Sequence, residues 1–369
     1  MNRKVIGLIL AFTLLASTTS FADKTFSPFH SDIYALGMGD AFVAYGNNAN
    51  GFLYNPALLV RANGLKFSVI DIQASINTSF LDVVNYMSDN QEKFEDWDNL
   101  SAGDRNELLA GMESFDDRWV TGGGYPSVNL VLPLGVGLAV YNNLSLKVKL
   151  DKGIYEPRGY ADLKNDLVFV GGYARQITDN LALGANAKFI SRRNTGAIKL
   201  RASEFGNAND IYETAKDSLE SAKSGFGLDM GALYSLKSNL DLGVSINDLI
   251  GGIDDDHFPI NLRAGVSYRY TGGFVGNGFL KEIVFAGDIE DLFNQDGDNF
   301  FNKVHLGADI VMPIINFRFG FNQGYPCIGT GLNLKFVALN YAYIGKELGS
   351  SPGRQSDYSH YVQLKIGIM

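Results

Sequence analysis

The sequence predicts an all-β protein: a transmembrane antiparallel β-barrel of about fourteen strands, with an N-terminal plug segment and two helical extracellular loops. Many segments alternate strictly between apolar and polar residues, which is typical of strands with two different faces. The connections between them alternate between short and long, as in bacterial outer-membrane barrels. The 42 glycines, 25 phenylalanines and 18 tyrosines suit twisted strands with aromatic girdles, although a large soluble β-protein could share this composition.

The first residues have the pattern of a bacterial export signal. Arg3 and Lys4 supply its charge, and residues 5–16 form an apolar stretch too short to span a bilayer. Small residues stand at the two positions of 20–22 that specify cleavage, so we expect residues 1–22 to be a cleaved signal peptide. We therefore expect an exported protein located in the cell outer membrane.

Residues 23–62 precede the first strand-like segment and are predicted to form the plug. Within this block, residues 35–60 are too rich in Gly and Asn for a membrane strand, and too apolar for a loose tail. Asn55 can cap a short helix that Pro56 opens, and Gly37 and Gly39 allow a close backbone approach to a barrel wall. The alternative is a periplasmic arm that packs outside the barrel.

Polar side chains of this block could bond to polar side chains that face the lumen, such as Arg263, Arg269 or Arg318. The candidate partners in the block are Asp40, Asn47, Asn48 and Asn50. The predicted plug or gate residues are Gly37, Gly39, Asp40, Asn47, Asn55, Pro56 and Ala57.

Residues 63–369 are predicted to form the barrel. Between 136 and 150, apolar residues fill most even positions and polar residues most odd positions, and 226–234, 260–270 and 315–322 repeat the scheme. A soluble sandwich also alternates, but Lys, Arg and Asn near mid-strand suit a wet lumen better. The predicted lumen-facing polar residues are Lys147, Lys149, Asp229, Arg263, Arg269 and Arg318.

The lengths of the connections support a barrel with two different rims. Short turns are expected near 133–135, 178–180, 237–239, 313–314 and 336–337. Long polar connections are expected at 79–118, 151–159, 203–223, 249–258, 291–301 and 346–357. The connection at 271–279 is longer than its rim predicts.

Two long connections have helical patterns. Ser101 stands before Asp104 with capping-box spacing, and Leu108, Leu109, Met112 and Phe115 then share one face. In the second loop, Ile211, Ala215, Leu219 and Ala222 recur at helical spacing. These helices could form a lid or docking surface at the outer mouth, or simply pack on the barrel rim.

Several motifs resemble the FadL-like superfamily of outer-membrane proteins, which includes long-chain fatty-acid transporters, PorV-like proteins and conjugal-transfer TraF-like proteins. The resemblance begins with 36–42, Leu-Gly-Met-Gly-Asp-Ala-Phe, and 55–57, Asn-Pro-Ala. The stretches 225–234, 245–249, 317–326 and 339–343 are similar to the PorV-like and TraF-like branches in particular. The resemblance implies an outer-membrane barrel of about fourteen strands whose lumen holds an N-terminal plug.

The resemblance implies a passive transporter of hydrophobic or amphipathic small molecules, with the outer-membrane bilayer as a partner. The alternative is a non-transporting scaffold, as in the PorV-like and TraF-like branches, that holds proteins of secretion or envelope assembly. An open aqueous porin is a third reading, which the predicted plug disfavours.

In FadL-like transporters, ligand leaves sideways through a gap in the wall beside a kinked strand. Asn142 is a polar residue at a lipid-facing position, and a bulge there could open a wall gap. The simpler reading is an Asn that local irregularity or the membrane interface tolerates.

The sequence contains no pattern that points to catalysis, so we do not expect an enzyme, a cofactor or a metal. His30, His257, His305 and His360 are scattered without metal-ligand spacing. The acidic runs at 254–256 and 296–298 could hold Ca²⁺, but such runs are more often plain turns. The net charge of −9 argues against nucleic acid as a partner, because phosphate binding needs clustered cations.

Overall fold

The protein is described from a computed structural model. It describes residues 31–46, 48–115, 118–153, 156–196, 198–201, 217–218, 221–273, 275–276, 278–295 and 297–368. The predicted signal peptide, Asn47 and the helix expected around 211–222, apart from a few residues, lie outside the described residues.

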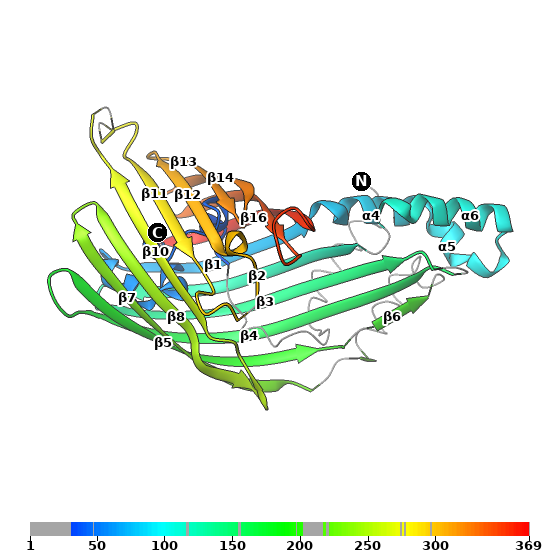
Figure 1. The fold of residues 1–369 in the computed structure, drawn as a ribbon, viewed down its shortest axis with the longest axis horizontal. Helices are drawn as coiled ribbons and strands as arrows, with labels where there is room; N and C mark the ends of the chain where they lie inside the picture. Colours follow the sequence, from blue (N-terminus) through cyan, green and yellow to red (C-terminus); the bar gives the residue numbers. More distant parts are fainter. Residues whose placement is uncertain are drawn as a thin grey trace.

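Fourteen antiparallel strands close into a ring, as the alternation predicts (Figure 1). The ring runs in chain order from β1 to β16, β8 pairs with β10, and β16 returns to β1 through pairs such as Phe67 with Ile368. Two short strands stand outside this ring, because β6 pairs with β4 and β9 with β8. The strands are β1 (Lys66–Asn77), β2 (Trp119–Leu132), β3 (Val136–Asp151), β4 (Arg158–Gln176), β5 (Leu181–Asn194), β6 (Ile198–Arg201), β7 (Lys223–Lys237), β8 (Leu240–Ile253), β9 (Asp256–His257), β10 (Asn261–Tyr270), β11 (Glu282–Ile289), β12 (Val304–Val311), β13 (Ile315–Asn322), β14 (Tyr325–Leu334), β15 (Val337–Glu347) and β16 (Ser356–Ile368).

The two faces of the strands differ in chemistry, as β13 illustrates. Phe319 is 50% exposed on the outer face, whereas the neighbouring Arg318 is 0% exposed on the inner face. The same alternation places Leu138 and Val140 of β3 outside, and Ala139 and Tyr141 inside. An apolar exterior around a polar interior is the arrangement that a barrel in lipid requires.

The described residues that precede β1 from Ser31 onwards lie inside the ring. We call residues 31–62 the N-terminal segment; it contains α2 (Ile33–Gly37), α3 (Gly51–Tyr54) and the 3₁₀ helix η1 (Pro56–Arg61). Helix α2 contacts β13 to β16, while η1 contacts β4, β5 and β7 on the other side of the ring. A segment that touches both sides of a closed ring through its buried residues occupies the interior.

A helical excursion connects β1 to β2. It contains α4 (Thr78–Asp89), α5 (Gln91–Glu95), η2 (Trp97–Asn99), α6 (Ala102–Gly111) and η3 (Met112–Ser114). Ser101 caps α6 by accepting a hydrogen bond from the Asp104 N–H. Leu108 and Met112 are buried in one apolar cluster with Leu146 of β3 and Leu163 of β4, so the excursion packs on the extended ends of the strands (Figure 1). No helix in the described part of the chain is long and apolar enough to cross a membrane.

The β3–β4 ladder shows no bulge at Asn142, and the possible wall gap there stays a prediction. Strand β3 pairs with β4 in one unbroken register along its whole length, with Asn142 opposite Leu167. The ladder between β2 and β3 is interrupted at Tyr125 and Pro126, because a proline has no N–H to donate. Beyond these residues it resumes in the same register. The register shifts instead in β1 between Ser68 and Ile70, and between β7 and β8 near Asp229 and Asp248.

Candidate functional site

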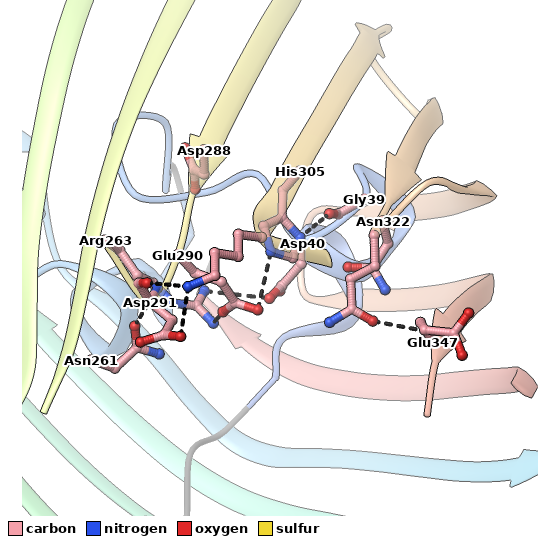
Figure 2. Close-up of polar contacts among 12 residues, drawn as sticks. Gly39, Asp40, Asn261, Arg263, Asp288, Glu290, Asp291, His305, Asn322 and Glu347 are labelled. Atoms are coloured by element: carbon pink, nitrogen blue, oxygen red, sulfur yellow. Dashed lines mark hydrogen bonds and ion pairs between the residues drawn. The ribbon is translucent and has the colours of Figure 1, made fainter. Parts of the chain in front are cut away.

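A group of polar contacts between the N-terminal segment and the wall lies at β10, β11 and β12 (Figure 2). The Arg263 guanidinium forms an ion pair with Glu290 and lies 3.4 Å from the Asp40 carboxylate. Asp40 has a positive φ of 68°, and its other carboxylate oxygen accepts a 2.7 Å hydrogen bond from the Tyr54 hydroxyl. A buried arginine thus joins a wall carboxylate to a segment carboxylate.

His305 of β12 extends this cluster to the backbone of the segment (Figure 2). Its Nδ1 lies 2.9 Å from the Gly39 carbonyl oxygen, and its Nε2 lies 3.2 Å from Glu290. The Gly39 carbonyl can only accept from Nδ1, and the Glu290 carboxylate near Nε2 favours a cation, so this geometry suits an imidazolium. His305 is 1% exposed, and breaking this link would leave buried polar groups without partners.

The next residues of the segment are held by their backbone. Asp288 of β11 accepts hydrogen bonds from the Phe42 N–H at 2.6 Å and from the Val43 N–H at 2.8 Å. Ser267 of β10 donates to the Ala44 carbonyl oxygen at 3.2 Å. These bonds satisfy backbone groups that no helix or strand uses, and they fix the path of the segment across the lumen.

Tyr54 connects two parts of the segment to each other. Its hydroxyl donates to Asp40 and accepts a 3.1 Å hydrogen bond from the Asp32 N–H. Burial raises the pKa of Tyr54 well above its ordinary value, and the Asp40 carboxylate raises it further. The phenol therefore stays protonated and keeps its donor role.

A second polar contact lies at β12 and β13. Asp309 accepts hydrogen bonds from the hydroxyls of Tyr34 and Tyr45, the latter at 2.9 Å. The Arg318 guanidinium lies over the Tyr34 ring, 3.5 Å from its centroid, and donates to Asn340 at 3.1 Å. Since Arg318 and Asp309 are both 0% exposed, this contact keeps two charges in the interior near each other.

The end of the segment is held on the other side of the ring. Asn55 caps η1 by accepting from the Ala57 N–H at 3.0 Å, and Pro56 occupies the first position of that helix. The Asn55 amide also donates to the Val43 carbonyl oxygen at 2.9 Å and to Ala232 of β7 at 3.1 Å. One asparagine side chain thus shapes the segment and fastens it to the wall.

The wall makes room for the segment with glycines that face inward. A Cβ added at any of five such glycines would lie within 2.9 Å of a backbone atom of the segment. This glycine collar consists of Gly184, Gly243, Gly307, Gly320 and Gly329, one each from β5, β8, β12, β13 and β14. Gly37 and Gly39 of the segment meet the same wall from inside, at Gly329 and at the Phe321 carbonyl oxygen.

We expect Gly320→Ala to displace the segment. The new Cβ would lie 2.5 Å from the Gly39 nitrogen, and overpacking of this kind costs about 1–3 kcal/mol. The matched control is Gly171→Ala in β4, whose Cβ would meet only Leu138, at 3.9 Å. Thermal unfolding in detergent, with limited proteolysis of the segment, should separate the two; equal behaviour would mean that the collar is not a steric constraint.

Most of the predicted plug residues lie where the segment meets the wall. Gly37, Gly39, Asp40, Asn55, Pro56 and Ala57 all lie in the contact between segment and wall, and Asn47 lies outside the described residues. Among the expected wall partners, Arg263 meets Asp40 and Arg318 meets Tyr34.

Other predicted residues have different partners. Asn48 and Asn50 donate to Asp32 within the segment, at 3.0 and 2.6 Å. Arg269 pairs with Asp241 of β8 at 2.7 Å, and Asp229 pairs with Lys188 at 2.8 Å. Lys147 is exposed and Lys149 lies by Trp119, 5.6 Å from its ring centroid, so neither belongs to this contact.

Sequence reasoning missed the carboxylates of the wall. Asp288, Glu290 and Asp309 make the contacts described above, yet none was expected to do so. The available signal was the position of Asp288 and Asp309 within strands at lumen-facing parity, where an unpaired carboxylate would be costly. Within the described residues, no group of three or more His, Cys, Asp or Glu is placed to hold a metal ion.

The comparisons with known proteins give the fold. The sequence matches no protein-family model and no curated protein. Among solved structures, it is similar to the Ralstonia pickettii toluene transporter TbuX, at 13% identity and a TM-score of 0.51 over 95% of this chain and 100% of that one. The Pseudomonas putida toluene transporter TodX has 12% identity and a TM-score of 0.50 over the same shares. The chain is also similar to a deltaS2S3 mutant of the TodX monoaromatic hydrocarbon channel, at 12% identity and a TM-score of 0.51, over 92% of this chain and 98% of that one.

Proposed function

We infer that this chain, a closed fourteen-stranded barrel similar in fold to the toluene transporters TbuX and TodX, has a FadL-like fold. From this starting point we propose that it is an outer-membrane protein that passively conducts hydrophobic or amphipathic small molecules, with the N-terminal segment as its luminal plug. The apolar outer face supports a location in lipid. The similar proteins TbuX and TodX are a toluene transporter and a monoaromatic hydrocarbon channel, which makes toluene a suitable first test compound.

The fastening of the N-terminal segment is the observation that carries the proposal. Its polar contacts reach β7, β10, β11 and β12, and the glycine collar accommodates its backbone. A segment held by separate hydrogen bonds and ion pairs, rather than by continuous strand pairing, can be released locally without opening the barrel. This is the property that a gated plug needs.

The scaffold alternative also has an observation in its favour. A cavity of about 540 Å³ lies against the segment and is lined by the charged residues Arg61, Lys66, Asp179, Arg269 and Glu282. An apolar molecule would gain little from such walls. Transport would then need a lateral route, and a barrel without one would serve as a holder for secretion or envelope proteins.

Uptake measurements separate these functions. Cells that export the full chain should accumulate radiolabelled toluene several-fold faster than cells with an empty vector, while uptake of a charged solute should not change. Uptake at the vector rate, with the barrel present and folded in the outer membrane, would contradict transport and favour the scaffold. The variant Asn142→Val tests the proposed wall gap. Asn142 lies where the β2–β3 ladder lacks the pairs of Tyr125 and Pro126. If cargo leaves through a gap there, this variant should slow toluene uptake.

A further inference from the structure

The wall of the barrel is much lower on one side than on the other. Strands β11, β12 and β13 have 8 residues each, whereas β3 has 16 and β4 has 19 and both reach out to the helical excursion (Figure 1). At about 3.3 Å per residue and a tilt of about 40°, the short strands cross about 20 Å of bilayer and β4 could cross about 48 Å. Since the apolar band of an outer-membrane barrel is about 25 Å tall, the strands of the low side do not cover it alone.

The outer face of this low side stays apolar up to the end of its strands. Phe317, Phe319 and Phe321 are exposed at alternate positions along β13. Phe321 is next to the last residue of β13, at the end of the barrel opposite the short turns, which we call the outer rim. The lipid-facing surface therefore reaches the outer rim, from which the β11–β12 loop rises.

The β11–β12 loop continues this apolar surface with a pair of aromatic side chains. The short 3₁₀ helix η5 (Phe300–Lys303) buries Asn302 and Lys303, and leaves Phe300 and Phe301 59% and 63% exposed. The Lys303 ammonium donates to the Asp291 carboxylate at 2.8 Å, and the two exposed rings pack edge to face with 5.9 Å between their centroids. The pair is thus a fixed feature of the loop.

The β15–β16 loop is bound to the β11–β12 loop at the outer rim. The Asn302 amide donates to the Gly349 carbonyl oxygen at 3.1 Å, and the Asn299 N–H donates to the Ser350 carbonyl oxygen at 3.1 Å. The two loops together expose five large apolar side chains, which we call the outer apolar residues: Leu292, Phe293, Phe300, Phe301 and Leu348.

Large apolar side chains that are exposed together mark a surface that meets lipid or another protein. Two observations favour lipid here. The low wall leaves about 5 Å of the apolar band uncovered, and the outer apolar residues begin where the wall ends. Phe321 also brings the lipid-facing surface without interruption to the base of the loops.

We propose that the outer apolar residues lie in the outer leaflet of the membrane, among the acyl chains just below the lipid head groups. They complete the lipid-facing surface on the side where the strands are too short to do so. The inference rests on the membrane location in the proposed function, and it holds equally for a transporter and for a scaffold. It assigns to lipid two loops of the rim at which outer-membrane barrels usually carry their water-exposed loops.

Spin labels on the full chain measure this depth. Cys327 is the single cysteine of the sequence and is buried, so Cys327→Ala provides the background. Labels are then placed by Phe301→Cys in the loop, by Phe319→Cys on the lipid-facing wall, and by Asp255→Cys in the exposed β8–β9 turn of the same rim. The protein is reconstituted in dioleoyl phosphatidylcholine vesicles, and heat-modifiable migration on gels shows that each variant has folded.

Depth follows from the ratio of collision rates with oxygen and with a water-soluble nickel chelate. We expect this ratio to be at least about fivefold higher for the Phe301→Cys label than for the Asp255→Cys label, because the hydrocarbon region excludes the polar chelate. The Phe319→Cys label should give a ratio at least as high. Phe293→Cys provides a second loop position and should behave like Phe301→Cys.

Bilayer thickness provides an independent measurement. Dilauroyl phosphatidylcholine forms a thinner hydrocarbon region, closer to the height of the low wall. In these vesicles the ratio for the Phe301→Cys label should fall at least about twofold toward that of the Asp255→Cys label, because the loops then emerge from the lipid. The ratio for the Phe319→Cys label should stay high.

Three results would overturn the inference. In the first, the chelate reaches the Phe301→Cys and Asp255→Cys labels equally. In the second, neither oxygen nor the chelate reaches the Phe301→Cys label, which would indicate a protein partner or a second copy of this chain. In the third, the ratio at this position does not respond to bilayer thickness. If the chelate also reaches the Phe319→Cys label in a folded barrel, the membrane location itself fails, so the two failures are told apart.

Discussion

Deletion of residues 31–62 should turn a barrel that conducts little into an open pore. We expect single-channel conductance in planar bilayers to rise at least about tenfold, because larger barrels without a filled lumen leave an aqueous channel. The glycine collar strengthens this expectation. With the segment gone, the collar has no side chains of its own to close the space.

Two controls make the conductance result decisive. Heat-modifiable migration on gels shows whether the shortened barrel has folded, and Asp288→Ala loosens the segment without removing it. Asp288 accepts two backbone N–H groups, so this variant should give brief openings instead of a steady current. A large steady current from the intact chain would contradict the plug, as would a folded deletion variant that does not conduct.

Arg318→Leu should destabilise the barrel by about 3–5 kcal/mol, because it leaves the buried Asp309 carboxylate without its nearby cation. The pair is loose, with 3.9 Å between the Arg318 Nε and an Asp309 oxygen, but both side chains are 0% exposed. The change also removes the guanidinium from the Tyr34 ring, and so loosens the segment. Urea unfolding of the detergent-solubilised protein measures the effect.

Arg269→Leu is the matched control for Arg318→Leu. Arg269 is 32% exposed, and its partner Asp241 keeps a second cation, Arg61, at 2.6 Å. We expect a loss of at most about 1 kcal/mol. Adding Asp309→Asn to Arg318→Leu should recover part of the lost stability, because the lone carboxylate is then neutral. Equal effects of the two leucine variants, or no recovery, would contradict the role assigned to the buried pair.

The alternation of residues was sufficient to predict the barrel and its fourteen strands, because a side chain's face in a strand depends on its position alone. The same parity placed Arg263 and Arg318 inward. The Asn55 cap and Pro56 at the start of a short helix were also predictable, since a cap depends only on neighbouring residues. Local sequence patterns were thus enough to predict the strands of the wall and one short helix of the segment.

The pairings inside the lumen could not be predicted in the same way. Arg269 was expected to meet the segment, but the adjacent strand offers it Asp241. His305 stood in a strand without a recognisable partner, and only the path of the segment brings the Gly39 carbonyl oxygen to it. Asn142 suggested a bulge because it is polar on the lipid side, yet the register there does not change. Such contacts depend on the path of the segment across the lumen. The periodicity of the sequence carries no information about that path.

The junction of the first and last strands has a consequence for assembly. Lys66 begins β1 directly after the N-terminal segment, and β1 pairs with β16, the last strand of the chain. This seam joins strands that are far apart in the sequence, so the cost of closing the intervening loop makes it a slow contact to form. Because the segment is tethered next to the seam, we expect it to lie within the curling sheet when the seam closes. Closure of the barrel would then also enclose the segment.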